Sequence, residues 1–222
     1  MPHLPSDAVG DRRDLATTSV FLDFDGTVSL VDVSDHLVER LASSGWQEVD
    51  AANRAGHLGT RAWLLEMWER LPHEEAMLRA VASEIAVDEG FESLVRALRE
   101  AGADVTVVSD GFGFYVEEAC RPLGIAVLTN RPDFATGRLE LPYEDRCCPC
   151  ATCGVCKQAP IKEARRDGRT TVLVGDGSSD FKAALLADVV FARGDLAAWC
   201  AANGIAHRPF ECLAEVERAL VG

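Results

Sequence analysis

Lysine is scarce in this sequence, and long apolar runs are missing from it. Only Lys157, Lys162 and Lys182 are lysines among 222 residues, and the formal net charge is −14. A chain this acidic lacks the basic surface that nucleic acids require, so we expect no nucleic-acid partner. No apolar run approaches the ~18 residues of a membrane span, so we expect no membrane association. Residues 1–18 contain no stretch resembling a signal peptide, which predicts a flexible lead-in and a cytoplasmic protein.

Internal repeats and low-complexity tracts are also absent. With 48% hydrophobic residues the chain can bury a full core, which suits one domain with an appendage or two small domains. Short segments rich in Val, Ile, Leu and Phe alternate with helical patterns, which indicates an α/β fold with a parallel sheet covered on both faces. The predicted strands are Val20–Asp23, Asp104–Ser109, Ile125–Thr129, Thr171–Gly175 and Asp188–Phe191.

Two stretches break this alternation. Residues 32–87 contain helical patterns and no convincing strand, so we expect an inserted helical cap. We expect Trp63 and Trp68 to be buried in the core of this cap rather than to form a surface that binds a ligand. The catalytic core would then comprise residues 19–31 and 88–222. Residues 129–157 read as a long loop with a hairpin, and a loop of that length in a compact domain is usually functional.

The stretch "VFLDFDGTVS" ends a hydrophobic strand on two carboxylates, Asp23 and Asp25. Asp176 ends another strand, and Asp180 follows one helical turn later. Because ligands bind at the carboxyl ends of parallel strands, these groups should converge on one edge of the sheet. Four carboxylates there require large pKa shifts or a cation, and oxygen-only ligation suits Mg²⁺ that also binds a phosphate.

Donors for such a phosphate are present at neighbouring positions. Ser109 ends a predicted strand and offers a hydroxyl, Gly111 offers a backbone N–H at a helix start, and Lys157 offers a positive charge. Each feature has an ordinary structural explanation when taken alone. Asp180 could be a helix N-terminal carboxylate, and Ser109 could be a helix cap.

Taken in order, "DFDGT", Ser109, Lys157 and "GDGSSD" resemble the four motifs of the haloacid dehalogenase-like (HAD) phosphohydrolases from about residue 19 onward. The resemblance implies a Rossmann-like fold, Mg²⁺ and a small phosphorylated metabolite as substrate. It also implies roles for the motif residues. Asp23 would be the nucleophile that forms a phospho-aspartate, and Asp25 the general acid and base whose backbone carbonyl ligates the metal.

The same resemblance assigns the remaining motif residues. Asp176 would be the acidic metal ligand and Asp180 its outer support, while Lys157 would offset the phosphate charge. Thr27 would supply a supporting hydroxyl. Ser109 and Lys157 would bind the phosphate together with the backbone of Asp110 and Gly111.

Within the family, the helical cap and "LTNRPDFATGRLEL" resemble the phosphoserine-phosphatase branch. Ser179 stands where that branch has Asn, and the cysteine run before Lys157 is foreign to it. The cysteines, "FARGDLAAWC" and "HRPFEC" look more like the methionine-salvage phosphatases that act on 2-hydroxy-3-keto-5-methylthiopentenyl-1-phosphate. Asp32, His36, Arg61 and Trp63 of the cap are candidates for substrate contact.

Several alternatives stay open at this point. A phosphoserine phosphatase-like enzyme, another phosphomonoesterase or a phosphomutase would use similar motifs. A dehalogenase is disfavoured because its chemistry does not need the acid at Asp25. A non-enzymatic scaffold is disfavoured by the complete set of motif residues. The sequence does not indicate an oligomeric state.

Five of the eight cysteines lie within ten residues, and Cys147, Cys150, Cys153 and Cys156 recur at every third position. Clustered cysteines in a cytosolic protein favour metal or redox chemistry over a disulfide framework. Four thiolates could bind a structural Zn²⁺, although four ligands so close together leave little chain to wrap an ion. Cys148 lies outside this set of four. Reduced thiols, a local disulfide and an iron–sulfur cluster are the alternatives.

If a structural metal is bound, it should hold Lys157, one residue past Cys156, at the phosphate site. Elemental analysis of protein purified without chelator should then find about one equivalent of zinc, and its removal should lower catalysis before the core unfolds. A zinc content below about a tenth of an equivalent, with all eight thiols reactive, excludes the metal.

Overall fold

One sheet of seven strands organises the chain, and the computed structural model describes residues 14–143 and 152–222. The strand order is β4-β3-β2-β1-β5-β6-β7, and every neighbouring pair is parallel except β3 with β4. The strands are β1 (Thr18–Leu22), β2 (Asp104–Phe112), β3 (Ala126–Asp133), β4 (Arg138–Glu140), β5 (Thr170–Gly175), β6 (Val189–Ala192) and β7 (Arg208–Pro209). The predicted α/β class and the five predicted strands are confirmed.

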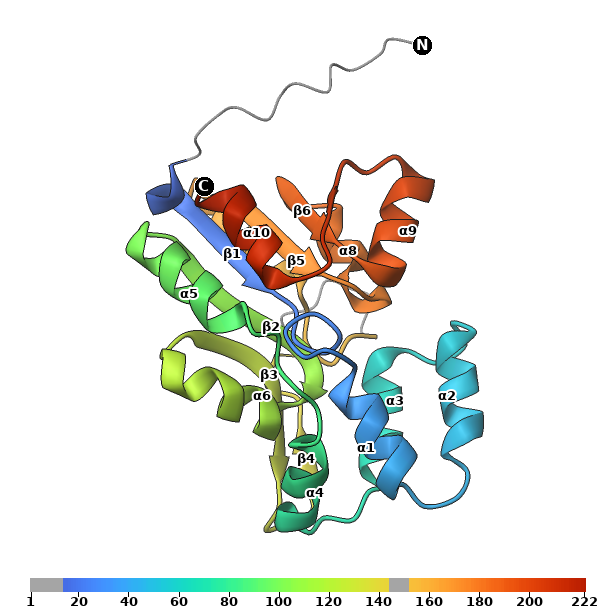
Figure 1. The fold of residues 1–222 in the computed structure, drawn as a ribbon. Coiled ribbons are helices and arrows are strands. Elements are labelled where there is room, and N and C mark those ends of the chain that lie inside the picture. Colours follow the sequence, from blue (N-terminus) through green and yellow to red (C-terminus); the bar gives the residue numbers. More distant parts are fainter. Residues whose placement is uncertain (1–13, 144–151) are drawn as a thin grey trace.

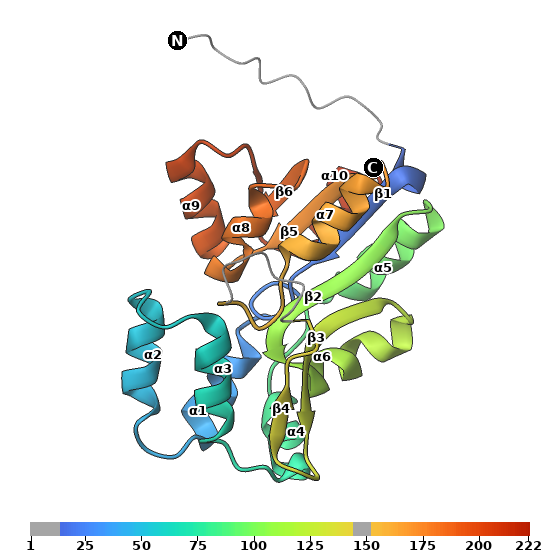
Figure 2. The ribbon, with the colours of Figure 1, turned by 180° about the vertical axis from the view of Figure 1, so that it is seen from behind.

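Helices cover both faces of the sheet, as Figures 1 and 2 show from opposite sides. The helices of the sheet region are α5 (Phe91–Glu100), α6 (Gly113–Cys120), α7 (Gln158–Arg166), α8 (Phe181–Ala184), α9 (Gly194–Asn203) and α10 (Leu213–Leu220). Alternate residues of β1 face opposite sides, as the pleat of a strand requires. Val20 and Leu22 share a hydrophobic cluster with α5, α6 and α10, whereas Phe21 shares one with α7, α8 and α9.

Residues 32–87, the predicted cap, form four helices: α1 (Val33–Leu41), α2 (Trp46–Arg54), α3 (Thr60–Trp68) and α4 (Glu75–Ala82). They lie beyond the carboxyl ends of the strands (Figure 1). Helix α2 was not among the predicted helical segments. Most of its residues are polar and none is fully buried, so this segment carries a weaker hydrophobic signal than the other cap helices.

Trp68 packs the cap against the core. Its indole lies 5.4 Å from the Phe112 ring and 5.9 Å from the Phe134 ring, and its Nε1 donates to the Gly137 carbonyl at 2.9 Å. It is 1% exposed, so the prediction that this tryptophan is core is confirmed. Side chains of the cap helices and of the sheet region belong to the same hydrophobic cluster. That residues 32–87 form a domain separate from the core therefore remains a prediction.

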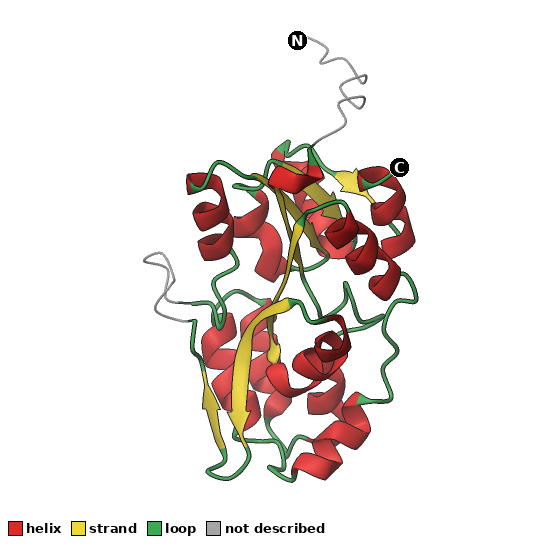
Figure 3. Cartoon of the chain, turned by 90° about the vertical axis from the view of Figure 1, so that its left-hand side faces the viewer, coloured by secondary structure: helices red, strands yellow, loops and turns green. Residues whose placement is uncertain are grey.

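The predicted hairpin is present as β3 and β4, which pair from Arg131 with Glu140 to Asp133 with Arg138. Gly137 adopts φ +70° in the turn, a conformation that favours glycine. Figure 3 shows the two strands extending beyond the rest of the sheet. None of the helices in the described parts of the chain combines the length and hydrophobicity that a membrane crossing requires.

Candidate active site

The site forms where β1, β2 and β5 end. Strand β1 lies between the other two, at the point where the strand order reverses direction, so its end faces a crevice open to ligands. Asp23 follows β1, Ser109 lies in β2, and Asp176 follows β5. The sheet therefore gathers residues from three distant parts of the sequence.

Asp23 is held in place from both sides. Its backbone N–H continues the sheet by donating to the Val174 carbonyl at 2.9 Å. Its Oδ1 accepts from the Phe24 N–H at 2.7 Å and from Lys157 Nζ at 2.7 Å. The residue is 5% exposed, and these donors fix the orientation of its carboxylate.

The turn that follows Asp25 packs closely against the Asp176 carboxylate. Gly26 has φ +75°, and a Cβ there would lie 2.3 Å from Asp176 Oδ2, so only glycine fits. Thr27 Oγ1 donates to Asp176 Oδ1 at 2.7 Å, which places the predicted supporting hydroxyl on this carboxylate. The Arg193 guanidinium donates to the Gly26 carbonyl, with Nε at 2.9 Å, and secures the turn.

Asp25 receives three hydrogen bonds. Ser109 Oγ donates to its Oδ2 at 3.0 Å, while the Tyr115 hydroxyl at 2.8 Å and the Val33 N–H at 3.1 Å donate to its Oδ1. Burial raises the pKa of Asp25 above its usual value, and the hydrogen bonds from Tyr115 and Ser109 oppose that rise. Burial and hydrogen bonding thus act in opposite directions on this carboxyl, which suits a group that gives up and takes back a proton during catalysis.

Ser109 and Gly111, the predicted phosphate donors, are themselves bonded in this structure. The Gly111 N–H donates to Ser109 Oγ at 2.9 Å, and Ser109 is fully buried. The Asp110 carbonyl accepts from Asn130 Nδ2 at 2.7 Å, and its carboxylate accepts the Val155 N–H. Phosphate binding by residues 109–111 stays a prediction.

Lys157 lies among carboxylates. Its Nζ is 2.7 Å from Asp23 Oδ1 and 2.8 Å from Asp180 Oδ1, and it donates to Ser179 Oγ at 2.7 Å. Burial would lower the pKa of Lys157, but the neighbouring carboxylates of Asp180, Asp23 and Asp110 outweigh it and raise the pKa. The ammonium is therefore charged at any physiological pH.

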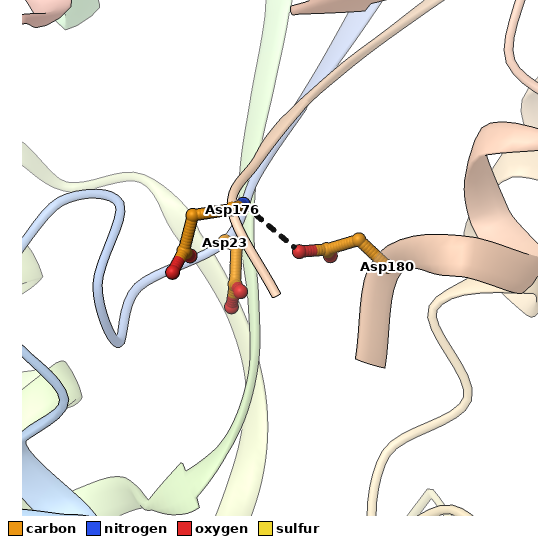
Figure 4. Close-up of side chains that lie close together, drawn as sticks. All are labelled: Asp23, Asp176 and Asp180. Carbon is orange, nitrogen blue, oxygen red and sulfur yellow. Dashed lines mark hydrogen bonds between the residues drawn. The ribbon is translucent and has the colours of Figure 1, made fainter. Parts of the chain in front are cut away.

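Asp23, Asp176 and Asp180 form the group of side chains with metal-ligand spacing among residues 14–143 and 152–222, since one oxygen of each lies within 4.8 Å of the others. Figure 4 shows the Asp23 and Asp176 carboxylates side by side, with Asp180 approaching from the next helix. Asp180 Oδ1 contacts Lys157, and its Oδ2 accepts the backbone N–H of Asp176 and of Gly177, both at 3.3 Å. These contacts suit the predicted supporting position of Asp180.

The charges of this cluster favour a cation. Burial, assisted by Asp180, raises the pKa of Asp176 to about 6. Burial, again with Asp180, raises the pKa of Asp23 well above its usual value, against the opposing effect of Lys157. A divalent cation beside Asp23 and Asp176 would relieve this repulsion, and hard oxygen ligands suit Mg²⁺. The residues present therefore fit the predicted metal.

A cavity of about 830 Å³ opens from the aspartates toward the cap. Asp32 and Trp63, two of the predicted contact residues, line it, and Trp63 Nε1 donates to Asp50 at 3.3 Å. His36 instead pairs with Glu84 at 3.0 Å, and the Arg61 N–H donates to the Thr152 carbonyl at 2.9 Å. Cap residues that the sequence did not single out, such as Asp35, Asp50 and Arg54, also line the cavity.

Tyr115 and Arg193 are the site residues that sequence reasoning missed. Tyr115 lies four residues past Gly111, within the apolar first half of α6. Arg193 was noticed within "FARGDLAAWC" only as part of a resemblance. Neither residue carries a local sequence signal, because each acts through a contact with the "DFDGT" loop that only the fold creates.

The described chain does not support the zinc prediction at the cysteines. Cys156 is buried and Cys153 is partly buried. Cys147, Cys148 and Cys150 lie outside the described residues, so the proposed ligand set stays untested.

Comparison with known proteins identifies the family of this chain. Residues 20–185 match the family model described as haloacid dehalogenase-like hydrolase. The chain belongs to the haloacid dehalogenase-like hydrolase family. A relative from Exiguobacterium sp. strain AT1b, named 2-hydroxy-3-keto-5-methylthiopentenyl-1-phosphate phosphatase, is 31% identical over 93% of this chain and 98% of its own length. A protein of the same name from Lysinibacillus sphaericus is 26% identical over 90% of this chain and 94% of its own length.

Solved structures of the family share the fold. A phosphoserine phosphatase described as a phospho-aspartyl intermediate analogue superimposes with a TM-score of 0.69 at 21% identity, over 91% of this chain and 98% of that one. A probable phosphoserine phosphatase from Vibrio cholerae gives a TM-score of 0.70 at 18% identity, over 96% of this chain and 67% of that one. The family and its HAD fold, expected from the four motifs, are therefore confirmed.

We predict that Mg²⁺ stabilises this protein more at pH 7.5 than at pH 5. The pKa of Asp176 is raised to about 6 in the folded state, so the stability that its proton supplies is lost as pH rises through that value. At pH 5 Mg²⁺ must displace this proton, whereas at pH 7.5 it meets an ionised carboxylate. The Mg²⁺-induced rise in melting temperature, measured by scanning fluorimetry, should therefore grow with pH.

The control variant is Asp133→Asn, which alters a partly exposed aspartate of the β3–β4 turn, away from the carboxylate cluster, and should respond as wild type does. Asp176→Asn should abolish the Mg²⁺ response. Equal shifts in wild type at the two pH values would contradict this prediction.

Proposed function

We propose that this hydrolase is a Mg²⁺-dependent phosphatase that cleaves a small phosphorylated metabolite through a phospho-aspartate on Asp23. The observation that carries the proposal is the Lys157 ammonium, which touches Asp23 at 2.7 Å inside a buried acidic site. A lysine so placed can offset the charge of an incoming phosphate, and it opposes the rise that burial causes in the pKa of Asp23. Bound Mg²⁺ would supply further positive charge to the transferring phosphoryl group.

In the first step, Asp23 attacks phosphorus. Oδ1 is held by Lys157 and the Phe24 N–H, so Oδ2 is the oxygen that forms the new bond. As the bond between phosphorus and the leaving oxygen breaks, Asp25 gives its proton to that oxygen. Burial raises the pKa of Asp25, a direction that favours its acting as the proton donor.

In the second step, water attacks the phosphorus of the phospho-aspartate. Asp25, now ionised, takes a proton from that water, and the bond from phosphorus to Asp23 breaks to release inorganic phosphate. Tyr115 and Ser109 hold the Asp25 carboxylate in one orientation through both steps. Thr27 and Arg193 keep Asp176 and the loop of Asp25 aligned.

Asp23→Asn should abolish phosphate release while leaving the fold intact, because an amide has nearly the same shape but cannot attack phosphorus. We expect at least a ~1,000-fold fall in kcat with p-nitrophenyl phosphate, as is typical when a nucleophile is removed. Inorganic phosphate is the product to measure, since a phosphomutase would return the phosphoryl group to its substrate. Full activity in this variant would sink the assigned mechanism.

For the substrate, we propose the enol phosphate for which the two curated relatives are named. Among the described residues that line the cavity, Arg54 is the one cation, and it already pairs with Asp50 at 2.7 Å and Asp35 at 3.4 Å. Asp32 lines the cavity as well. The ammonium of phosphoserine could pair with an aspartate there, but its carboxylate would meet net negative charge. The hydroxy-keto chain of the enol phosphate carries no charge that needs a partner.

The methionine-salvage enol phosphate should therefore be hydrolysed with at least a ~10-fold higher kcat/KM than phosphoserine, a difference of about 1.4 kcal/mol. Phosphoethanolamine, which lacks only the carboxylate of phosphoserine, isolates the contribution of charge and should also exceed phosphoserine. Asp35→Asn should reduce the difference in kcat/KM between phosphoethanolamine and phosphoserine. A preference for phosphoserine would overturn this substrate assignment but not the phosphatase reaction.

A further inference from the structure

The segment from Thr152 to Cys156 joins the cap to the catalytic lysine. At its start, the Thr152 carbonyl accepts the Arg61 N–H of α3 at 2.9 Å. At its end, Lys157 follows directly and reaches Asp23. Contacts that fix the backbone of residues 152–156 therefore also fix the position of the Lys157 backbone next to the site.

Gly154 shows how little room this path has. A Cβ on Gly154 would lie 2.4 Å from Leu64 Cδ1 on α3, 3.0 Å from Asp110 Oδ1 and 3.1 Å from Asn130 Nδ2. Contacts below 3.0 Å require a neighbour to shift. The segment therefore passes between the cap and the end of β2 in a gap where any side chain at position 154 requires Leu64 to shift.

The Asp110 carboxylate anchors the segment at this point. Its Oδ1 accepts the Val155 N–H, two residues before Lys157. The Asp110 main chain is itself held, because Asn130 Nδ2 donates to its carbonyl at 2.7 Å and to the Gly111 carbonyl at 3.2 Å. Asp110 thus connects a rigid part of β2 to the segment that carries the lysine.

We propose that Asp110 is a positioning residue whose carboxylate, by holding Val155, sets the position of the Lys157 ammonium beside Asp23. This inference rests on the proposed phosphatase function and gives the Asp110 side chain a role apart from the phosphate contact of its backbone. Asp110 acts through geometry, so what matters is an acceptor oxygen at the position of Oδ1. An asparagine supplies that oxygen and an alanine does not.

The first test compares Asp110→Ala with Asp110→Asn. In Asp110→Ala, kcat should fall by at least about tenfold because the lysine loses its fixed position. Asp110→Asn should stay within about threefold of wild type, since its amide oxygen can accept the same hydrogen bond. Asp133→Ala is the matched control, because Asp133 also accepts a backbone N–H, at 2.9 Å, but lies in the exposed β3–β4 turn. Equal losses in the alanine and asparagine variants would overturn the proposal.

The second test separates positioning from general loss of structure. The dissociation constant of inorganic phosphate, measured by calorimetry with Mg²⁺ present, serves as a readout that does not need turnover. Asp110→Ala should weaken phosphate binding when Lys157 is present and have no further effect in a Lys157→Ala background. An additive effect in the double variant would contradict a role exerted through Lys157.

Gly154→Ala provides a probe that leaves Asp110 unchanged. The added methyl group should displace the segment and weaken phosphate binding in the same Lys157-dependent manner. Normal phosphate binding in both Gly154→Ala and Asp110→Ala would reject the proposal. Failure of the wild-type protein to bind phosphate or hydrolyse phosphomonoesters would instead contradict the proposed function, and the role of Asp110 with it.

Discussion

The buried ammonium of Lys157 is the interaction on which the rest of the site depends. Asp23 and Asp180 lie within 2.8 Å of it, and Asp176 adds a further carboxylate to the same sheet edge. Removing one partner of a buried ion pair costs about 3–5 kcal/mol because the other charge remains uncompensated. With one lysine facing three carboxylates, the site keeps an excess of negative charge that suits a divalent cation.

This balance explains why supporting groups surround the carboxylates. Asp180 is fully buried, and its oxygens are satisfied by Lys157 and by two backbone N–H groups. Thr27 donates to Asp176, and Arg193 holds the Gly26 carbonyl. Each of these contacts fixes a charged group before any ligand arrives, which lowers the reorganisation that catalysis requires.

The sequence was sufficient for the sheet and the motif residues, because both leave local signals. Apolar strands that end on aspartate or serine predict that these polar residues meet at the carboxyl edge of the sheet. The parallel order of β2, β1 and β5 brings Asp23, Ser109 and Asp176 together as expected. Contacts made across the fold left no such signal. Tyr115 donates to Asp25 from the apolar first half of α6. Arg193 donates to the Gly26 carbonyl, although 167 residues separate the two in the sequence. Helix α2 gave a weak sequence signal because most of its residues are polar and none is fully buried.

The predicted cap contacts the catalytic groups and the core directly. Val33 at the start of α1 donates to Asp25, and Trp68 at the end of α3 packs on Phe112 of β2. A displacement of the cap would therefore change the environment of Asp25 directly. Asp32, which lines the cavity, and Val33, which donates to the proposed proton donor Asp25, lie together at the start of α1. Cap residues can thus affect kcat as well as KM, since binding energy in the cap can be used to align the leaving oxygen with Asp25.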